Sequence, residues 1–312
     1  MQPRDFSGYA AHRRVGIRFP VRSGSGTRRT QALARELLEW SGVVMNESLH
    51  VTEYNPGNGA GTLVLLHGFP VDHRMWDACA PFVSAEWHVL GVDLPGLGES
   101  PIPEVEPSLD QSARLVAEVI VGLKGPDSGP LICAGLSMGG YVAQAIMRVN
   151  PDLLDGVVLL DTRVTADAAG PRENRFMVAA EVERLGSSEP VMGMATATLS
   201  EETVEERPDI VEFMQTLIRS QSAAGVAWSQ RAMASREDST EVVKAFAKPT
   251  LIIVGEDDTI SPPDVMMQIA RLVPGARAEV IAHAGHMSPV EQPAAVAEVI
   301  NAFLVDSFGT EN

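Results

Sequence analysis

Short apolar runs alternate with amphipathic stretches along most of the chain. A continuous apolar run is typical of a strand buried on both faces of a sheet. Residues 48–54 instead alternate polar and apolar positions, which predicts an edge strand. Buried strands are expected at 62–67, 87–93, 131–136, 156–161, 250–255 and 278–282, and helices at 75–84, 108–123, 138–149, 263–272 and 291–306.

Strand alternating with helix predicts parallel strands joined by right-handed crossovers. The expected fold class is therefore α/β, with a doubly wound, mostly parallel sheet. Residues 162–247 interrupt the alternation, because they contain helical stretches near 173–185, 204–221 and 224–236 but no convincing strand. We expect this block to form a helical cap inserted into a core made of residues 45–161 and 248–312.

The first 44 residues differ from the rest of the chain in charge. They carry eight Arg and three acidic residues, a net charge of +5, which leaves −22 for the rest of a chain whose total is −17. A short helix is expected at 30–40. Three interpretations of this segment are open. It is an upstream extension or dispensable tail before a start at Met45, or it is a docking arm. It could also be a targeting segment, since transit peptides are rich in Arg and poor in acidic residues.

The overall composition excludes several classes of partner. A net charge of −17 argues against nucleic acid and anionic membranes, which need clustered Lys and Arg. No run of about 18 apolar residues predicts a membrane span, and no secretory signal is visible, so the cytoplasm is the default location. Cys79 and Cys133 lie in apolar surroundings and are expected to be buried thiols. No metal-ligand spacing or nucleotide motif is visible, so no cofactor is expected.

The pentapeptide GLSMG at 135–139 carries the main chemical signal. It follows an expected strand and precedes an expected helix, which is the context of a nucleophile on a sharp strand-to-helix turn. The flanking glycines allow strand and helix to approach closely. The turn places Ser137 at the carboxyl end of the sheet, where open α/β folds bind ligands.

A Ser hydroxyl needs a neighbouring base, and the base needs an acid that orients it. In this arrangement the acid follows a later strand and the His comes last. The expected strand at 250–255 is followed by three acidic residues, 256–258, and the last expected strand is followed by His283 and His286. All of these positions lie on the same edge of the predicted sheet as Ser137.

These segments resemble the α/β-hydrolase superfamily over residues 47–305. Within it, the chain is similar to the branch of capped esterases, enol-lactonases and cofactor-free haloperoxidases. The matching segments are HGFP at 67–70, DLPGLGES at 93–100, GLSMG at 135–139, GEDDTISP at 255–262 and AGHMSPVEQP at 284–293.

The resemblance implies a role for each matching residue. Ser137 is the expected nucleophile and His286 the general base and acid. Asp258 is the expected orienting acid, with Asp257 and Asp161 as the alternatives. The backbone N–H groups of Phe69 and Met138 are expected to form the oxyanion hole, and His283 is expected to be structural. Candidate pocket residues, which could equally be core residues, are Trp76, Met177, Met194 and Trp228.

The expected reaction is hydrolysis of a small carboxylic ester, lactone or thioester through an acyl-enzyme intermediate. Perhydrolysis of the haloperoxidase-like kind and C–C bond hydrolysis are alternatives on the same three residues, and a non-catalytic protein that binds a small ligand is an alternative of another class. Dehalogenases and epoxide hydrolases are disfavoured because they resemble this chain but have Asp where it has Ser137. The substrate is expected to be a small molecule, and the oligomeric state is left open.

All of the matching segments lie after residue 44, which predicts that the basic head is dispensable for catalysis. A chain that begins at Met45 should hydrolyse p-nitrophenyl acetate at the rate of the full chain, as measured by initial velocities at equal enzyme concentration. Loss of activity in the shortened chain would make the basic head part of the working enzyme.

Overall fold

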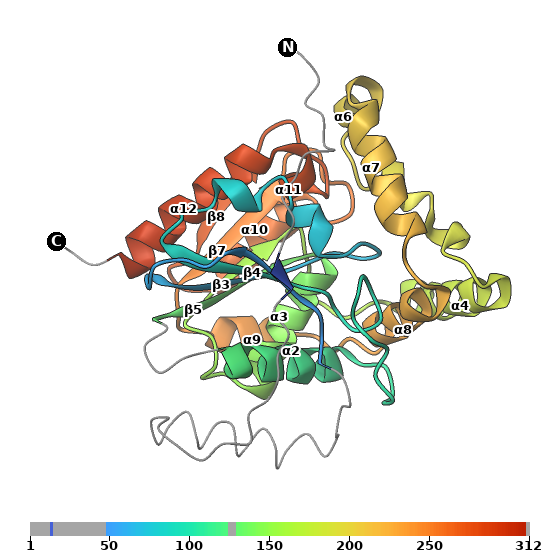
Figure 1. Ribbon diagram of the computed structural model, residues 1–312, viewed down its shortest axis with the longest axis horizontal. Helices are drawn as coiled ribbons and strands as arrows, with labels where there is room; N and C mark the ends of the chain where they lie inside the picture. The colour runs from blue at the N-terminus through green and yellow to red at the C-terminus, as the bar shows by residue number, and fades with distance from the viewer. Residues whose placement is uncertain (1–12, 15–47, 124–128, 310–312) are drawn as a thin grey trace.

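The computed structural model describes residues 13–14, 48–123 and 129–309 (Figure 1). The helix expected at 30–40 lies outside the described residues, as does most of the basic head. Of that head, the two-residue strand β1 (Arg13–Arg14) is described, and it pairs antiparallel with the next strand at the edge of the sheet.

A mostly parallel sheet forms the centre of the protein, as the hydrophobic pattern predicts. The strand order is β1-β2-β4-β3-β5-β6-β7-β8; β2 runs antiparallel to β4, and the strands from β4 to β8 are parallel to their neighbours. After β4 the chain crosses over β3 to form β5. The loops after β3 and β5 therefore open side by side at the carboxyl edge, where such a reversal leaves a crevice for ligands. The strands are β2 (Val51–Asn55), β3 (Gly61–Leu66), β4 (Trp87–Val92), β5 (Leu131–Leu136), β6 (Gly156–Leu160), β7 (Thr250–Gly255) and β8 (Arg277–Ile281).

Helices cover both faces of the sheet, and side chains of the central strands are almost wholly buried between them. On one face α2 packs against α3, and α3 packs against α9; α12 lies on the other face (Figure 1). The two layers bury the apolar faces of both helices and strands, which makes this α/β arrangement stable. The core helices are α2 (Leu109–Leu123), α3 (Met138–Val149), α9 (Thr240–Ala245), α10 (Pro263–Leu272) and α12 (Pro293–Phe308).

Two of the expected helices are divided in the structure and a third begins later than expected, so these predictions were wrong in detail. The stretch 75–84 forms two 3-10 turns, η2 (His73–Trp76) and η3 (Ala80–Phe82). The stretch 204–221 is split into α6 (Glu201–Glu206) and α7 (Pro208–Arg219). The helix expected at 291–306 is α12, which begins at Pro293, after the separate short helix α11 (Ser288–Glu291). In each pair the second element has proline in its first turn, because proline lacks an N–H but fits the start of a helix.

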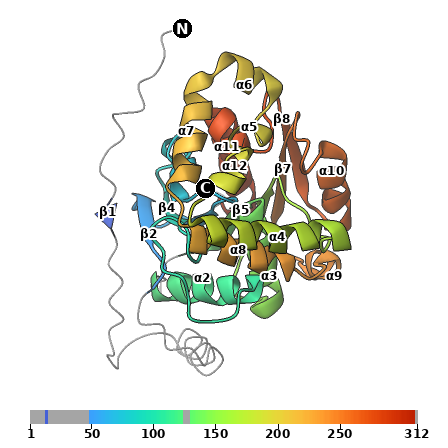
Figure 2. The same ribbon diagram turned by 90° about the vertical axis from the view of Figure 1, so that its right-hand side faces the viewer.

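The block between β6 and β7 is helical, and α4 to α8 stand to one side of the sheet (Figure 1). The last helix of the block, α9, instead packs against α3 and α10 of the core, so the cap ends before residue 240 and not at the expected boundary of 247. In the quarter-turned view of Figure 2, α4 and α8 lie alongside each other and α6 and α7 extend away from them. The remaining elements of the cap are α4 (Ala169–Leu185), η4 (Glu189–Val191), α5 (Met194–Ala197) and α8 (Ala223–Ala234). Among the described residues, no helix combines the length and apolarity needed to cross a membrane.

Candidate active site

Ser137 occupies a backbone conformation that few residues other than glycine adopt. Its φ is 52° and its ψ is −110°, at the junction between β5 and α3. Such a conformation costs on the order of 1–3 kcal/mol and persists only where the surroundings enforce it. Here the Ser137 N–H donates to Leu160 O at 2.9 Å, and the Thr162 hydroxyl donates to Ser137 O at 2.8 Å. Both partners belong to β6 and the loop that follows it.

The glycines around Ser137 are required by backbone-to-backbone contacts. A Cβ on Gly135 would lie 2.3 Å from Gly139 O, and a Cβ on Gly139 would lie 2.4 Å from Leu66 O. A Cβ on Gly140 would lie 2.6 Å from the Thr162 hydroxyl. Glycine at these positions lets the start of α3 pack directly on the ends of β3 and β6, which holds the turn in place.

The structure brings His286 and Asp258 together at the same edge of the sheet. His286 Nδ1 lies 2.8 Å from Asp258 Oδ2, and both side chains are almost completely buried. The other oxygen, Asp258 Oδ1, accepts the N–H groups of Ile260 (2.7 Å) and Ser261 (2.9 Å). These bonds fix the carboxylate. A carboxylate on Nδ1 selects the tautomer of His286 that keeps the lone pair of Nε2 free.

Asp257 and Asp161, the alternatives to Asp258 as the orienting acid, lie in other environments. Asp257 is exposed, and its N–H donates to Ala284 O. Asp161 is fully buried, but its oxygens accept from Gly255 N–H at 2.8 Å and from the Ser288 hydroxyl at 2.5 Å. Burial, and in addition the negative charge of Asp258, hold the pKa of Asp161 well above its usual range. Asp258 is therefore the acid whose carboxylate contacts the imidazole of His286.

Two backbone N–H groups border Ser137 from different elements. Met138 begins α3, and within the described residues its N–H has no acceptor; the same holds for the N–H of Phe69. The Phe69 loop lies close to the turn, since a Cβ on Gly68 would be 3.7 Å from Ser137 Cβ. Two free donors beside a Ser hydroxyl can stabilise a negative charge that develops on a bound carbonyl oxygen.

His67 connects the Phe69 loop to the loop after β4. Its Nδ1 lies 2.8 Å from Gly68 O, and its Nε2 lies 2.8 Å from the Leu94 N–H. The carbonyl needs a donor and the N–H needs an acceptor, so His67 is the neutral tautomer protonated on Nδ1. Burial lowers its pKa, which is consistent with a neutral ring. His67 therefore acts as a fixed link rather than as a base.

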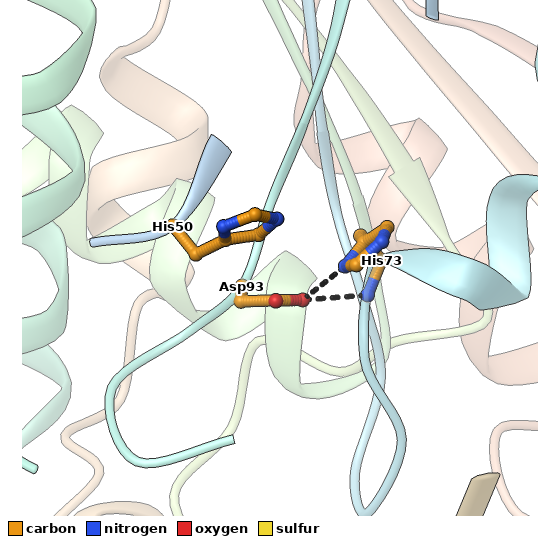
Figure 3. A group of neighbouring side chains, drawn as sticks. All are labelled: His50, His73 and Asp93. Carbon is orange, nitrogen blue, oxygen red and sulfur yellow. Dashed lines mark hydrogen bonds and ion pairs between the residues drawn. The ribbon is translucent and has the colours of Figure 1, made fainter. Parts of the chain in front are cut away.

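A second link in this region joins His73 to Asp93 (Figure 3). Asp93 Oδ1 accepts both the backbone N–H and the Nδ1–H of His73 at 2.8 Å, and Asp93 Oδ2 accepts the Glu99 N–H. Burial lowers the pKa of His73, but the hydrogen bond and charge of Asp93 outweigh burial and raise it. The pair thus fixes η2 against the loop after β4.

His50 lies beside this pair, and the three residues are the one group among the described residues with the spacing of metal ligands. The ring centroids of His50 and His73 are 5.3 Å apart. However, a metal ligand needs a free lone pair. Asp93 Oδ1 already accepts two N–H groups and His73 Nδ1 donates to it, so the group is a structural clamp.

Gln221 fastens the cap to the loop that follows Phe69. Gln221, between α7 and α8, donates from Nε2 to Asp72 Oδ2 at 2.7 Å and accepts the Gly98 N–H on Oε1 at 2.8 Å. Arg74 donates to both oxygens of Asp72, from Nε to Oδ1 at 2.8 Å and from Nη2 to Oδ2 at 2.6 Å. Burial raises the pKa of Asp72, but Arg74 outweighs burial and lowers it. Asp72 is thus a buried, charged anchor for the cap.

The candidate pocket residues occupy different environments. Trp76 is fully buried, and Trp228 is nearly so; within the described part of the chain neither indole N–H has a hydrogen-bond partner. Met194 is partly buried in α5. Met177 is 60% exposed on α4, so its position gives no support to a role in a pocket. His283, which is expected to be structural, is exposed and bonds to Glu202.

The two thiols add no chemistry to this site. Cys79 and Cys133 are buried and free, and burial raises the pKa of each to about 12. A thiol with such a pKa remains protonated and unreactive at neutral pH.

Three comparisons place the chain among known proteins. The sequence model described as "Alpha/beta hydrolase family" matches residues 63–299. A solved thermophilic esterase from Thermogutta terrifontis is 36% identical with a TM-score of 0.77, covering 83% of this chain and 94% of that one. The 2-hydroxy-6-oxononadienedioate/2-hydroxy-6-oxononatrienedioate hydrolase of a Pseudomonas species is 25% identical over 88% of this chain and 98% of its own length. The chain spans 45% of another relative, the biotin biosynthesis bifunctional protein BioHC of Teredinibacter turnerae, at 26% identity over 80% of this chain.

The buried, neutral state of His67 predicts a pH-dependent contribution to stability. The pKa of His67 is lowered in the folded protein, so the unfolded chain takes up the proton first as the pH falls. The stabilisation is therefore complete above an unfolded value near 6.5 and is lost below it, by at most about 1.4 kcal/mol per pH unit.

Urea unfolding of the wild type and of His67→Gln between about pH 7.5 and about pH 5 measures this contribution. The stability advantage of the wild type should shrink as the pH falls. His283→Gln is the matched control, because that exposed ring has a raised pKa from its bond to Glu202, so its removal should produce no such decline. A constant difference between wild type and His67→Gln would show that His67 is not held neutral.

Proposed function

Because the chain belongs to the alpha/beta hydrolase family and is a hydrolase of that fold, we propose that it cleaves small carboxylic esters, lactones or thioesters by serine catalysis. Ser137 is the proposed nucleophile, His286 the base and Asp258 the residue that orients His286. The observation that carries the proposal is the buried bond of 2.8 Å from His286 Nδ1 to Asp258 Oδ2, on the same edge of the sheet as the strained turn at Ser137.

In the proposed first half-reaction, Ser137 Oγ attacks the carbonyl carbon and His286 Nε2 takes the hydroxyl proton. Asp258 accepts the Nδ1–H of His286 and stabilises the imidazolium that forms. The oxyanion accepts the N–H groups of Phe69 and Met138, each worth about 2.7–4 kcal/mol in such sites. The bond from carbon to the leaving oxygen or sulfur then breaks, and His286 donates its proton to the leaving group.

In the second half-reaction, water attacks the acyl-enzyme while His286 takes one of its protons. The tetrahedral intermediate collapses, the bond to Ser137 Oγ breaks, and His286 returns the proton to Ser137. The products are a carboxylic acid and an alcohol or thiol. Fixing the imidazole through Asp258 serves both halves, because the same nitrogen must accept and donate in turn.

The cap is proposed to define the substrate pocket above Ser137. Trp228 in α8 and Met194 in α5 remain the candidates for its wall, since both belong to the cap and are at least partly buried. The Thermogutta terrifontis esterase supports the choice of esters as substrates, because it is the relative with 36% identity.

C–C bond hydrolysis is the second candidate function. A relative at 25% identity is named for the hydrolysis of a 2-hydroxy-6-oxo dienedioate, whose name contains a ketone and two carboxylates but no ester. The same three residues can serve that reaction, as they can serve perhydrolysis. A substrate panel of short and long acyl esters, lactones, such dienedioates, and esters with added peroxide distinguishes these activities.

The proposed roles predict a sharp kinetic pattern. Replacing the nucleophile or the base, Ser137→Ala or His286→Ala, should lower kcat for p-nitrophenyl acetate by about 10⁴-fold or more. Asp258→Asn should lower it by about 10⁴-fold, because the wrong tautomer is then favoured. The measurement is steady-state kinetics, with circular dichroism to show that each variant is folded.

His283→Ala is the matched control, because His283 lies three residues before His286 but is exposed. Its kcat should stay close to that of the wild type. Near-normal turnover by Ser137→Ala or by His286→Ala would contradict the proposed catalytic residues. A larger loss in Asp257→Asn than in Asp258→Asn would transfer the orienting role to Asp257.

A further inference from the structure

Glu291 is a buried carboxylate that the proposed reaction does not use. It lies at the end of α11 with 2% of its surface exposed. Its Oε1 accepts the Gly285 N–H at 2.9 Å and its Oε2 accepts the Ser200 N–H at 2.9 Å. Within the described residues no cation pairs with it. Buried carboxylates are unfavourable unless hydrogen bonds compensate, so these two amide groups account for its placement.

The two amide groups that Glu291 joins belong to different parts of the protein. Gly285 immediately precedes His286, and Ser200 is the N-cap of α6 in the cap. Residues 198–200, which we call the cap connector, link α5 to α6. Glu291 therefore connects the cap to the backbone next to the proposed catalytic base. Glu291 and Ser200 are 91 positions apart in the sequence.

A second bond joins the cap connector to the other side of His286. The Met287 N–H donates to Thr198 O at 3.1 Å. Both neighbours of His286 thus direct their N–H groups toward Glu291 or the cap connector. A peptide backbone held on both sides of a residue restricts the direction in which its side chain leaves the chain.

The contact between the cap connector and the His286 loop is too close for a side chain. A Cβ on Gly285 would lie 2.5 Å from Ser200 N and 2.7 Å from Leu199 C. The absence of a side chain at Gly285 allows the two backbones to meet directly. The Asp258 side of the loop is held separately, by the Asp257 N–H that donates to Ala284 O at 2.9 Å.

We propose that Glu291 and the cap connector position His286, so that the cap supports the catalytic base in addition to covering the substrate. Glu291 is a positioning residue, since it bonds to the backbone beside His286 and not to the ring. The catalytic meaning of this inference rests on the proposed function. The positioning of the His286 ring is independent of the proposed function, because the bond from His286 to Asp258 exists whatever the substrate is.

Glu291→Gln is the sharpest variant, because it keeps the shape of the side chain. Glutamine has one carbonyl oxygen and one NH₂ group, so only one of the two amide N–H groups keeps an acceptor. Misplacing a catalytic group by about 1 Å can lower the rate by about 10²-fold. We therefore expect kcat for p-nitrophenyl acetate to fall between about tenfold and about 10²-fold, with KM changed by less than about twofold.

The control is Asp155→Asn. Asp155 also accepts a backbone N–H, that of Leu131 at 2.9 Å, but at the amino end of β5, away from the site. Asparagine keeps one oxygen that can accept this N–H, so the variant should leave kcat unchanged. Glu291→Asp is a second, milder variant in case Glu291→Gln does not fold, since it keeps the charge but is too short to bridge both amides.

A second readout is independent of turnover. In proton NMR, the low-field resonance of the His286 Nδ1–H, identified by its absence in His286→Ala, reports the bond to Asp258. It should shift or broaden in Glu291→Gln and stay unchanged in Asp155→Asn. A change in this resonance, with no hydrolysis of esters, lactones or thioesters by the wild type, would sustain the positioning role and refute the proposed function.

One result would overturn the positioning role of Glu291. If folded Glu291→Gln and Glu291→Asp both keep the wild-type kcat and an unchanged His286 resonance, while losing only stability, Glu291 is a structural residue. The positioning proposal is then wrong, although the proposed ester hydrolysis by Ser137 stands.

Discussion

The sharp turn at Ser137 is the constraint on which the rest of the site depends. It exists because backbone packs on backbone: Gly135 against Gly139, and Gly139 against Leu66 at the end of β3. These contacts join β5, β3 and the start of α3 at one point of the carboxyl edge, and they stabilise a Ser conformation with φ of 52° that would otherwise be unfavourable. Once the turn is fixed, the start of α3 and the Phe69 loop come to lie on either side of Ser137.

The parts of the site that surround this turn are held by buried polar links, not by apolar packing alone. His67 joins the Phe69 loop to the loop after β4, and Asp258 fixes His286. The cap is attached at two of these loops, through Gln221 to the Asp72 loop and through Glu291 to the His286 loop. In each of these links the buried polar side chain has a hydrogen-bond partner, as a low-dielectric interior favours. A displacement of the cap would therefore move both the loop that carries Phe69 and the loop that carries His286.

Features encoded over a few consecutive residues could be predicted from the sequence. The buried strands and the sharp turn at Ser137 each have a local pattern. The helices were overextended because apolar periodicity continues across Pro81, Pro208 and Pro293, where the backbone cannot continue unchanged. The direction in which a side chain points was harder to predict. Met177 fits an amphipathic helix but is exposed, and Asp257 and Asp258 differ in burial although they are adjacent, because they lie in the turn after β7, where no periodic pattern applies. Glu291 and Gln221 gave no local signal, since their partners lie 91 and 149 positions away.

The central claim is that Ser137 is an activated nucleophile because His286, oriented by Asp258, takes its proton. The most direct measurement is covalent labelling with a fluorophosphonate, followed by peptide mass spectrometry to locate the modified residue. The account predicts that the label is found on Ser137 in the wild type, and that labelling is slowed by orders of magnitude in His286→Ala although Ser137 is still present. Labelling at another residue, or equally fast labelling of Ser137 without His286, would contradict it.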